Sequence, residues 1–594
     1  MCGIVGYTGR RPCRPLLLDG LSRLEYRGYD SAGIALAADD EVVTTRAVGN
    51  LDALRASLRG ESDAFTGIGH TRWATHGRVS EENAHPLSCE QGRVHLVLNG
   101  IVENHLELRA RLQGSGVTFS SQTDAEVVAH LVAAHYDRDL TAAVRAVLPQ
   151  LQGHFAIVVM AADAPGVLVG TRRECPLVVG VGEHGHFFAS AVAAFLSETR
   201  RVMELEDGDI VTLTPDGPQL DGAFRATIDV GFEHETPTRG AFDTFMRKEI
   251  SDQPAAVART LFDSGAAGLD PQRVRDARSL RIVACGTSYN AGLVAQHLIE
   301  HWAGLPVEVE VASEYRYRTP LPGAGDLVLG ITQSGETADT LAAMRAARER
   351  GALVLALTNV EGTAATREAD VTLFTRAGLE VGVAATKTFT AQVAALAAFA
   401  VRLGIARRHL SPEEADAIVQ DLARLPDLIE QTIAGAEDWA ERAAEELHDA
   451  PLWMFLGRGA GTAVAMEGAL KLKEVSYVPA DAYAAGEMKH GPIALLGPGT
   501  PVVCVATYSP VLDKLLSNMA EVRTRGARVL AVATAGDTRP AAYADDVVEV
   551  PDSRWELQPL LAVIPLQLLA YRVASARGLN VDQPRNLAKT VTVE

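Results

Sequence analysis

The chain has 594 residues, 47% of them hydrophobic and 22% charged, and this composition is typical of a folded globular protein. Because domains average about 150 residues, the length predicts several domains rather than one core. The formal net charge of −20 and the absence of a Lys/Arg-rich run argue against nucleic acid as a partner. The six cysteines show no metal-ligand spacing, no apolar run reaches the roughly 20 residues of a membrane span, and no secretory leader opens the sequence. We therefore expect a cytoplasmic protein without membrane partners or disulfides.

The N-terminal third of the chain is rich in predicted strands. Short apolar runs bounded by turn residues predict strands at Gly3–Val5, Gly33–Leu36, Val94–Leu98, Phe155–Val159, Val167–Val169 and His186–Ala189. Helical periodicity predicts helices at Pro15–Glu25 and Asp124–His135. Strands that outnumber helices in this way indicate a layered α+β domain.

A polar, irregular stretch from Asp221 to Gln253 follows, and we interpret it as a linker. Beyond it, strand-like runs alternate with Ala-rich helical segments, which is the pattern of a parallel α/β sheet. The predicted strands are Leu280–Ala284, Leu327–Ile331, Leu353–Thr358 and Val371–Phe374. Met344–Leu357 also aligns with Met519–Val532, and both segments run through Arg-Gly-Ala into a strand. This favours an internal duplication over a chance likeness of Ala-rich segments.

Cys2 stands directly behind the initiator methionine in the opening segment MCGIVGY. Removal of Met1 would give this cysteine its own α-amine, whose ordinary pKa of about 7.7–8 lets it act as a base at neutral pH. A thiol beside such an amine is a self-contained nucleophile and base, and Gly3 leaves room for a substrate. The alternative interpretation is an incidental cysteine in the first strand.

Three further motifs carry the groups that an N-terminal hydrolase acting on glutamine needs. An arginine must hold the α-carboxylate of the substrate, a carboxylate must hold its α-ammonium, and a side-chain amide with a backbone N–H must form an oxyanion hole. Arg72 in GHTRWATHG, Asp124 in SQTDAE, and Asn99 with Gly100 in LNGIVENH supply these groups. A metal site at the histidines of the first motif is disfavoured, because no third ligand is apparent and Arg72 stands between them.

These motifs, together with LEYRGYDSAG and HPL, resemble the glutaminase domain of class II amidotransferases. The resemblance implies an N-terminal-nucleophile fold, in which two sheets are sandwiched between helices, with Cys2 as the nucleophile and Asn99 and Gly100 as the oxyanion hole. It also implies that Trp73 gates an ammonia channel. The implied glutamine-binding residues are Arg72, Trp73, Thr75, His76, His85 and Asp124.

The second half of the chain holds two hydroxyl-rich loops, each behind a predicted strand: CGTSYNAG at Cys285–Gly292 and TQSGETADT at Thr332–Thr340. A strand followed by Gly, Ser and Thr and then a helix presents backbone N–H groups and hydroxyls that cradle a phosphate without lysine. Ordinary helix N-caps are the alternative for either loop alone. Two such loops in consecutive α/β units favour a sugar-phosphate site. The sequence contains no Walker motif and no iron–sulfur cysteine cluster.

Glu467, Lys471 and Glu474 share one face of a predicted helix. Exposed Glu–Lys pairs at this spacing are frequent, and that interpretation competes with a catalytic one. A short polar loop, Gly486–His490, follows the helix, and a carboxylate with a histidine near a sugar are the groups that ring opening and proton transfer need. The Pro-bounded tail VDQPRNLAKTVTVE contains Lys589, for which composition alone predicts no role.

Over essentially its whole length the chain resembles the family of isomerizing glutamine–fructose-6-phosphate aminotransferases, on the segments CGTSY, QSGETADT, EGALKLKE, GEMKHGP and DQPRNLAKTVTVE. The resemblance implies that Glu474 is the proton-transfer base, His490 opens the sugar ring and Lys589 forms a Schiff base. The implied sugar-phosphate site contains Ser288, Thr332, Gln333, Ser334, Thr337, Val383, Ala385, Lys471 and Ala588. Thr332 and Ala385 stand where serines are expected, so Ala385 loses a side-chain contact, although a backbone contact from it would survive.

The expected fold class is an α+β N-terminal-nucleophile (αββα) glutaminase domain followed by two α/β doubly wound, flavodoxin-like sugar isomerase (SIS) domains. The expected boundaries are 2–219 for the class II glutamine amidotransferase domain, 220–268 for a linker, 271–412 and 444–585 for the SIS domains, and 586–594 for a tail that contributes to the sugar site.

The resemblance implies that L-glutamine and D-fructose 6-phosphate are converted to L-glutamate and D-glucosamine 6-phosphate, which starts hexosamine precursor synthesis, with ammonia channelled from one site to the other. No metal or organic cofactor is expected. A homodimer that forms through the SIS domains is expected. Two alternatives stay open. One is a class II amidotransferase with another acceptor, such as phosphoribosyl pyrophosphate. The other is a SIS-type sugar-phosphate sensor with a vestigial glutaminase, against which intact Cys2, Glu474, His490 and Lys589 count.

Overall fold

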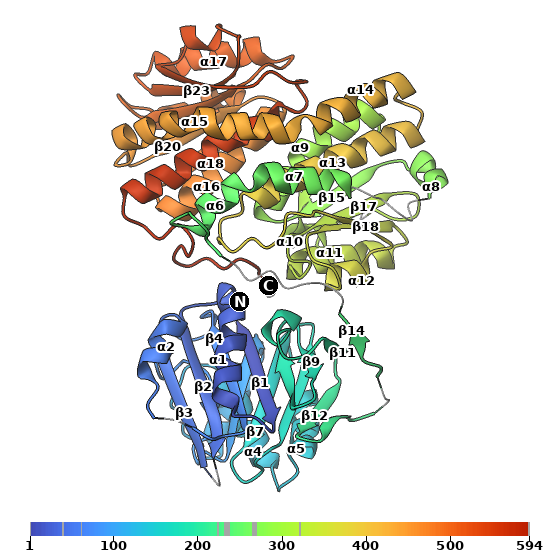
Figure 1. Cartoon of the computed structure of the whole chain (residues 1–594), viewed down its shortest axis with the longest axis vertical. Coiled ribbons are helices and arrows are strands. Elements are labelled where there is room, and N and C mark those ends of the chain that lie inside the picture. Colours follow the sequence, from blue (N-terminus) through green and yellow to red (C-terminus); the bar gives the residue numbers. More distant parts are fainter. Residues whose placement is uncertain are drawn as a thin grey trace. The chain divides into compact units, whose positions relative to one another are not determined.

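The computed structural model describes residues 2–38, 41–60, 62–222, 225–230, 238–263, 270–319 and 322–591. The chain forms two compact units (Figure 1). Unit 1 contains Met1–Glu235 with Thr590–Val593, and unit 2 contains Thr236–Lys589 with Glu594.

Unit 1 is built on two antiparallel sheets. The first has the strand order β14-β11-β9-β10-β1-β4-β2-β3, and the second has the order β13-β12-β8-β7-β6-β5. The strands of the first sheet are β1 (Gly3–Gly9), β2 (Ser31–Ala38), β3 (Glu41–Val48), β4 (Thr66–Arg72), β9 (Val178–Val181), β10 (Gly185–Ala189), β11 (Arg201–Glu204) and β14 (Ile228–Asp229). Those of the second are β5 (Leu87–Ser88), β6 (Val94–Gly100), β7 (Phe155–Ala161), β8 (Leu168–Arg173), β12 (Ile210–Thr214) and β13 (Gly217–Leu220).

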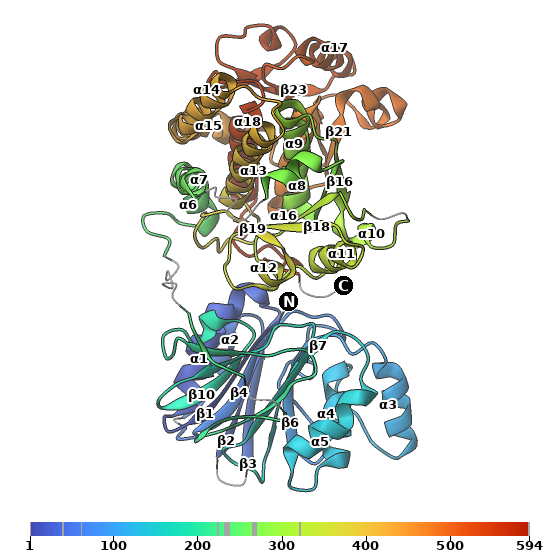
Figure 2. The ribbon, with the colours of Figure 1, turned by 90° about the vertical axis from the view of Figure 1, so that its right-hand side faces the viewer.

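Side-chain alternation along β1 explains the layers of unit 1. Ile4 packs into a core between the two sheets, whereas Val5 and Tyr7 pack with α1 on the outer side. The outer side of the second sheet packs against α3, α4 and α5. The helices of unit 1 are α1 (Cys13–Leu24), α2 (Leu51–Ser57), α3 (His105–Gly114), α4 (Asp124–His135) and α5 (Leu140–Val147). Figure 2 shows the resulting order of helices, sheet, sheet and helices, which confirms the predicted αββα sandwich.

Unit 2 contains two parallel five-stranded sheets, β16-β15-β17-β18-β19 and β21-β20-β22-β23-β24. In chain order both read 2-1-3-4-5, the arrangement of doubly wound flavodoxin-like folds, as predicted. The strands of the first sheet are β15 (Leu280–Ala284), β16 (Val307–Val311), β17 (Leu327–Ile331), β18 (Leu353–Thr358) and β19 (Val371–Phe374). Those of the second are β20 (Trp453–Gly457), β21 (Ala480–Ala484), β22 (Pro501–Ala506), β23 (Arg528–Thr534) and β24 (Asp546–Val550). The identical strand order supports the predicted duplication.

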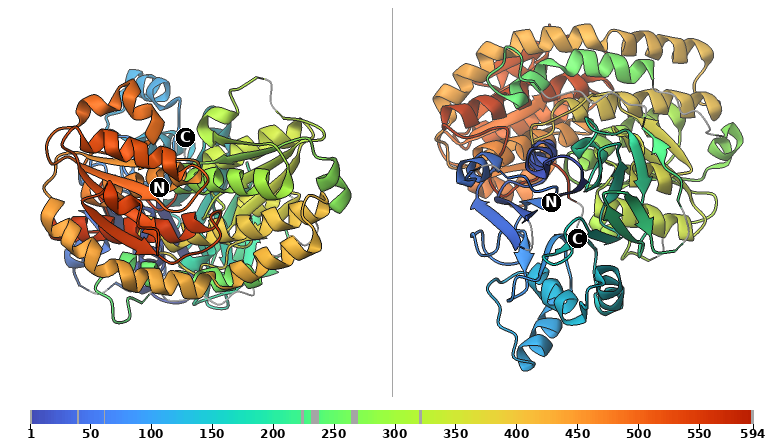
Figure 3. Two further views of the ribbon diagram at one scale, coloured as in Figure 1. Left: turned by 90° about the horizontal axis from the view of Figure 1, so that it is seen from above. Right: turned by 60° about the horizontal axis from the view of Figure 1, so that its bottom comes forward.

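The two halves of unit 2 share one hydrophobic core. Helix α9 packs against α16, and Trp302 Nε1 on α9 donates a 3.2 Å hydrogen bond to Glu556 Oε1 in the second half. Figure 3 shows the half up to α13 (green to yellow) beside the half from β20 onward (orange to red). The helices of unit 2 are α6 (Phe245–Ser251), α7 (Gln253–Phe262), α8 (Pro271–Asp276), α9 (Gly286–Ala303), α10 (Ala312–Tyr315), α11 (Ala338–Glu349), α12 (Ala364–Glu368), α13 (Lys387–Ala406), α14 (Pro412–Ala423), α15 (Leu425–Leu447), α16 (Ala460–Ser476), α17 (Leu512–Arg523) and α18 (Gln558–Ala576).

The segment expected to be a linker, 220–268, is helical over part of its length. Helices α6 and α7 lie within it, and their buried Met246, Ile250 and Val257 belong to the core of unit 2. The polar composition concealed these helices, because only one face of each carries apolar side chains. The helical part of the segment therefore belongs to the body of unit 2.

Within the described residues, α13 and α18 are long and apolar enough to cross a membrane. Most of each apolar window, 83% and 78% respectively, is buried inside unit 2. A helix that is apolar on all sides is also what the centre of a large core requires, so the packing accounts for both compositions.

Candidate active sites

Cys2 lies immediately before β1, where the chain packs too closely for a side chain at the next position. A Cβ on Gly3 would lie 2.7 Å from Thr71 Oγ1 and 2.8 Å from Leu24 Cβ. The backbone N–H of Trp73 donates to Cys2 Sγ at 3.2 Å. Burial raises the pKa of the Cys2 thiol, and the hydrogen bond from Trp73 acts in the opposite direction. A base is therefore needed to form the thiolate, which is the role predicted for the α-amine of Cys2.

Asn99, at the end of β6, contacts the backbone of Cys2, the predicted nucleophile. Its Nδ2 donates to Cys2 O at 3.1 Å and to Ser190 Oγ at 2.8 Å. His70 Nε2 lies 3.2 Å from Asn99 Oδ1 and 3.0 Å from Leu98 O. Burial lowers the pKa of His70 to about 3, so its ring is neutral and, with the proton on Nε2, donates to both oxygens. This contact fixes the amide orientation that an oxyanion hole at Asn99 and Gly100 requires.

Arg72 and Asp124 lie beside the same loop in unit 1. The Arg72 guanidinium donates to the carbonyl groups of His76, Gly77 and Arg78, and these hydrogen bonds hold the loop against the Arg72 side chain. Asp124, at the start of α4, accepts the N–H of Val102 at 2.9 Å. His76 Nδ1 is 3.6 Å from Asp124 Oδ2, and that carboxylate raises the pKa of His76. Arg72 and Asp124 therefore both contact His76 in this loop.

The remaining predicted glutamine-binding residues differ in their surroundings. His85 is buried and its ring stacks on that of His70, with ring centroids 4.3 Å apart. Its ring thus packs against another side chain near Asn99. Thr75 is exposed in the loop between Trp73 and His76. Their roles toward glutamine stay predictions.

In unit 2, the predicted phosphate-binding hydroxyls lie in loops behind β15 and β17, at the carboxyl edge of the sheet where ligands of such folds bind. Ser288 Oγ, in the first turn of α9, accepts Gln392 Nε2 at 2.9 Å. The Thr332 and Thr337 hydroxyls are 2.7 Å apart, and Ser334 Oγ accepts the N–H of Glu336 at 3.2 Å. Gln333 contributes its carbonyl oxygen, which accepts the N–H of Asn359. Thr332 thus keeps a structural hydroxyl contact where a serine was expected.

The charged face of α16 is buried against the start of α9 and is not a surface ion pair. Lys471 Nζ lies 2.5 Å from Glu474 Oε2 and 3.0 Å from Thr287 Oγ1. Glu467 accepts Thr287 Oγ1 at 3.1 Å and Asn290 Nδ2 at 2.8 Å. Burial lowers the pKa of Lys471, but Glu474 and Glu467 outweigh it and raise the pKa. The exposed-pair interpretation is therefore wrong for Glu467 and Lys471, which are fully buried.

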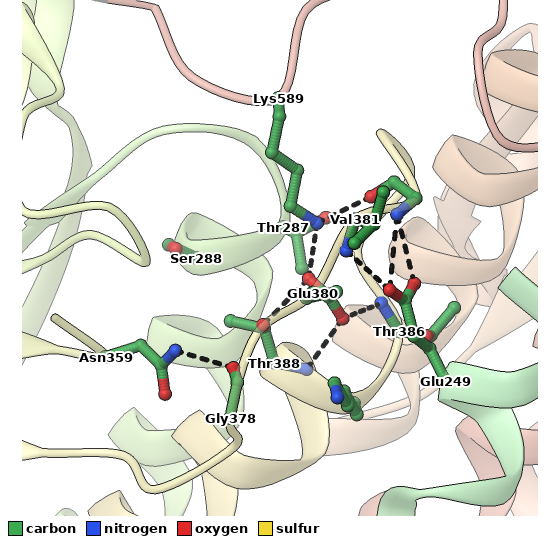
Figure 4. A network of polar contacts seen from close by, with 12 residues as sticks. Glu249, Thr287, Ser288, Asn359, Gly378, Glu380, Val381, Thr386, Thr388 and Lys589 are labelled. Carbon is green, nitrogen blue, oxygen red and sulfur yellow. Dashed lines mark hydrogen bonds and ion pairs between the residues drawn. The ribbon is translucent and has the colours of Figure 1, made fainter. Parts of the chain in front are cut away.

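Lys589, in the C-terminal tail, reaches the loop before α13 (Figure 4). Its Nζ donates to Gly382 O at 2.7 Å and forms an ion pair with Glu380. Glu380 also accepts the N–H groups of Thr386 and Thr388 at 2.9 and 3.1 Å. Burial by itself would raise the pKa of Glu380. Lys589 and these hydrogen bonds have the larger, opposite effect, and the pKa falls to about 2. The direct charged partner of Lys589 is thus a carboxylate, that of Glu380.

The tail is also fixed through the backbone of a predicted sugar-site residue. The N–H of Val383 donates to Asp582 O at 3.0 Å. Ala385, two residues further along the same loop, and Ala588, next to Lys589, are both half-buried. Their predicted contacts with the sugar phosphate stay predictions.

His490 is not joined to this group within one chain. It is exposed at the end of a 3₁₀ helix, η4 (Ala485–His490), and makes no hydrogen bond or ion pair with any described residue. Along β20, Met454 packs on the side of η4 and α17, whereas Phe455 packs on the side of α16. Because successive strand residues face opposite sides, η4 and Glu474 lie on opposite faces of the second sheet.

Sequence reasoning missed two buried acidic residues at the Lys589 site, Glu249 and Glu380. Glu249 fell within the expected linker, and Glu380 follows a strand in a loop with no charge pattern. The signal missed for Glu380 was an isolated acid among apolar and glycine residues. Across the described ranges, no three His, Cys, Asp or Glu side chains are arranged to hold a metal ion.

Matches to known domain families agree with this division of the chain. Residues 70–197 match the glutamine amidotransferase domain family, and residues 273–402 and 446–577 each match the SIS domain family. The chain is thus a glutamine amidotransferase domain followed by a tandem of SIS domains, as predicted from its motifs and its repeat.

Relatives that match the chain over its full length identify the particular family within this class of amidotransferases. A glutamine–fructose-6-phosphate aminotransferase (isomerizing) of Symbiobacterium thermophilum is 48% identical over 610 residues, which cover 100% of both chains. That of Aquifex aeolicus is 46% identical over 602 residues with the same coverage. The solved C-terminal domain of glucosamine–fructose-6-phosphate aminotransferase from Francisella tularensis is 37% identical, with a TM-score of 0.55, and covers 58% of this chain and 100% of its own. The chain belongs to the family of isomerizing glutamine–fructose-6-phosphate aminotransferases.

Proposed function

We propose that the chain converts D-fructose 6-phosphate and L-glutamine into D-glucosamine 6-phosphate and L-glutamate. The observation that carries the proposal is the assembly of Lys589, Lys471 and Glu474 beside the hydroxyl-bearing loops of unit 2. The reaction balances in two parts. Water converts glutamine to glutamate and ammonia, and ammonia replaces the carbonyl oxygen of the sugar, which leaves as water.

The first part takes place at Cys2. Its thiolate attacks the carboxamide carbon of glutamine, while Asn99 Nδ2 and the Gly100 N–H hold the oxygen that becomes negative. Ammonia leaves, and water then hydrolyses the thioester to release glutamate and restore the thiol. Arg72 and Asp124 bind the α-carboxylate and α-ammonium of the substrate. The supporting geometry is the 3.1 Å contact from Asn99 Nδ2 to the carbonyl of Cys2 itself.

The second part takes place in unit 2. Hydroxyls of Ser288, Ser334 and Thr337 hold the phosphate, and Lys589 attacks the carbonyl carbon of the open-chain sugar to form a Schiff base. The ion pair with Glu380 holds the amino group until a proton leaves it. Ammonia then displaces the lysine, and Glu474 carries a proton from C1 to C2 to complete the change from ketose to aldose.

A homodimer through the SIS domains would complete this site. Glu474 and η4 lie on opposite faces of the second sheet, so His490 from a second copy is the one able to open the ring at a given Glu474. Mixing Glu474→Gln with His490→Ala chains tests this. Random pairing of a two-fold dimer should restore about a quarter of wild-type activity, since one site of each mixed dimer is intact. No recovery after unfolding and refolding the mixture would refute the shared site.

The decisive assay for the function measures glucosamine 6-phosphate formed from glutamine and fructose 6-phosphate by the purified protein. Synthesis only with phosphoribosyl pyrophosphate would favour another amidotransferase, and sugar binding without synthesis would favour a sensor. We place the enzyme in the cytoplasm, with small-molecule substrates and neither nucleic acid nor membrane as partners, on the strength of its acidic charge and its scattered cysteines.

A further inference from the structure

Glu249 is a buried acidic residue that the proposed reaction does not use. It lies on α6 with 2% of its surface exposed, and its carboxylate accepts the backbone N–H groups of Val381 and Gly382 (Figure 4). A Cβ on Gly382 would lie 2.8 Å from Glu249 Oε2. The carboxylate therefore approaches this turn as closely as it does because residue 382 is glycine.

The turn that Glu249 holds is the one that holds Lys589. Gly382 O accepts Lys589 Nζ at 2.7 Å, and Glu380, the ion-pair partner of Lys589, directly precedes Val381. Both groups that contact the amino group are thus within two residues of the N–H groups that Glu249 accepts. A shift of the turn would move the carbonyl and the carboxylate together.

The same helix also fixes the tail that carries Lys589. The Asp582 carboxylate accepts the N–H groups of Phe245 and Met246 at 2.9 and 2.8 Å, at the N-terminus of α6. An acidic group at this place is stabilised by the free N–H groups and by the helix dipole. One short helix therefore holds the approach to Lys589 at its first turn and the partners of Lys589 through Glu249.

We infer that Glu249 is a positioning residue for Lys589: by holding the Val381–Gly382 turn it places the carbonyl and carboxylate that aim the amino group at the sugar. The inference rests on the proposed function, because it concerns the lysine that forms the Schiff base. Glu249 acts through the turn and touches neither the sugar nor the reacting atoms.

The charges around Glu249 add a signature that a purely structural residue lacks. Burial raises the pKa of Glu249 to about 8, Glu380 on the adjacent loop acts in the same direction, and Lys589 and Lys387 oppose them. Below that pH the Glu249 carboxyl is neutral. Above it a second negative charge stands near Lys589 and stabilises the ammonium form, which does not attack a carbonyl. The rate of Schiff-base formation should therefore carry a descending contribution near pH 8.

The test is borohydride trapping of the adduct between fructose 6-phosphate and Lys589 in the full-length protein, followed by peptide mapping. Glu249→Ala removes the anchor of the turn. Gly382→Ala keeps Glu249 but places a methyl group against its carboxylate, and since the backbone at Gly382 is not left-handed, the substitution adds no backbone strain. Both should trap Lys589 at least about tenfold more slowly, because a misplacement of 1 Å costs up to about 10²-fold.

Glu249→Gln separates the hydrogen bonds from the charge. Glu249 Oε1 accepts both N–H groups, so a glutamine carbonyl oxygen keeps them while losing the ionisation. This variant should trap at a rate near that of the wild type at pH 7 and should lose the decline near pH 8. Glu556→Gln, at a buried carboxylate beside Trp302, is the matched control and should keep both the rate and the pH profile.

The outcomes are distinguishable. If the wild-type protein forms no adduct on Lys589, the proposed function fails. If the wild-type protein forms it and Glu249→Ala and Gly382→Ala trap it equally fast, the positioning role of Glu249 is refuted. If Glu249→Gln keeps the wild-type pH profile, the additional effect of the Glu249 charge is refuted. Slow trapping by both alanine variants with rescue by glutamine supports the positioning role.

Discussion

Gly100 offers a sharp test of the glutaminase site, because its backbone conformation and its surroundings both exclude a side chain. Its φ angle is +92°, in the left-handed region. A Cβ there would lie 2.1 Å from His154 O and 2.7 Å from Cys175 Sγ. His154 O is a backbone atom that already accepts the N–H of Ile101, and Cys175 is buried. The backbone at Gly100 must therefore move, and with it the N–H assigned to the oxyanion hole.

The expected cost of Gly100→Ala has two parts. The left-handed conformation costs a non-glycine residue roughly 1–2 kcal/mol, and forced overpacking adds about 1–3 kcal/mol of destabilisation. Displacement of an oxyanion-hole donor lowers kcat by about 10²–10³-fold. Glutamate release from glutamine should therefore fall about 10²-fold or more, while fructose 6-phosphate binding by unit 2 stays unchanged.

Gly116→Ala is the matched control. Its φ angle is +89°, but nothing lies within 4 Å of the place where its Cβ would stand. This variant shares the backbone strain of roughly 1–2 kcal/mol without the collision, so it should lose stability but keep glutaminase turnover. If Gly100→Ala released glutamate as fast as Gly116→Ala, the assignment of Gly100 to the oxyanion hole would be refuted.

Four further outcomes are expected. Cys2→Ala should abolish glutamate release while Lys589 still forms its sugar adduct. Glutamate release at the wild-type rate would show that Cys2 is not the nucleophile. Glu474→Gln should slow synthesis by about 10²–10⁴-fold with glutaminase activity intact, as measured by parallel product and glutamate assays. Lys589→Arg should form no borohydride-trapped adduct, and an adduct on another lysine would remove the tail from the mechanism. Trp302→Phe should lower the free energy of unfolding by about 1–3 kcal/mol, since it leaves Glu556 without its indole donor, and unchanged chemical denaturation would argue against that contact.

The local sequence determined most of the secondary structure of this protein. The four strands predicted between Leu280 and Phe374 and the helix Asp124–His135 coincide with observed elements, whereas β16 was not predicted. The agreement arises because apolar periodicity and turn residues act over a few residues. The glutaminase motifs could also be recognised from the sequence, since Cys2, Arg72, Asn99 and Asp124 stand in short segments of characteristic composition. The duplication was visible because both halves keep the same strand and turn pattern.

The tertiary structure alone decided which distant groups meet. Glu249 and Glu380 lie more than a hundred residues apart, and Lys589 lies still further along the chain, yet all three converge on one turn. No local pattern could reveal this, because burial of a charge depends on what the rest of the fold packs around it. Long-range packing also placed helices α6 and α7 of the expected linker in the core of unit 2, and it separates His490 from Glu474. Local sequence specified the parts, and long-range packing determined which charges were buried together and which faces of the sheet they occupied.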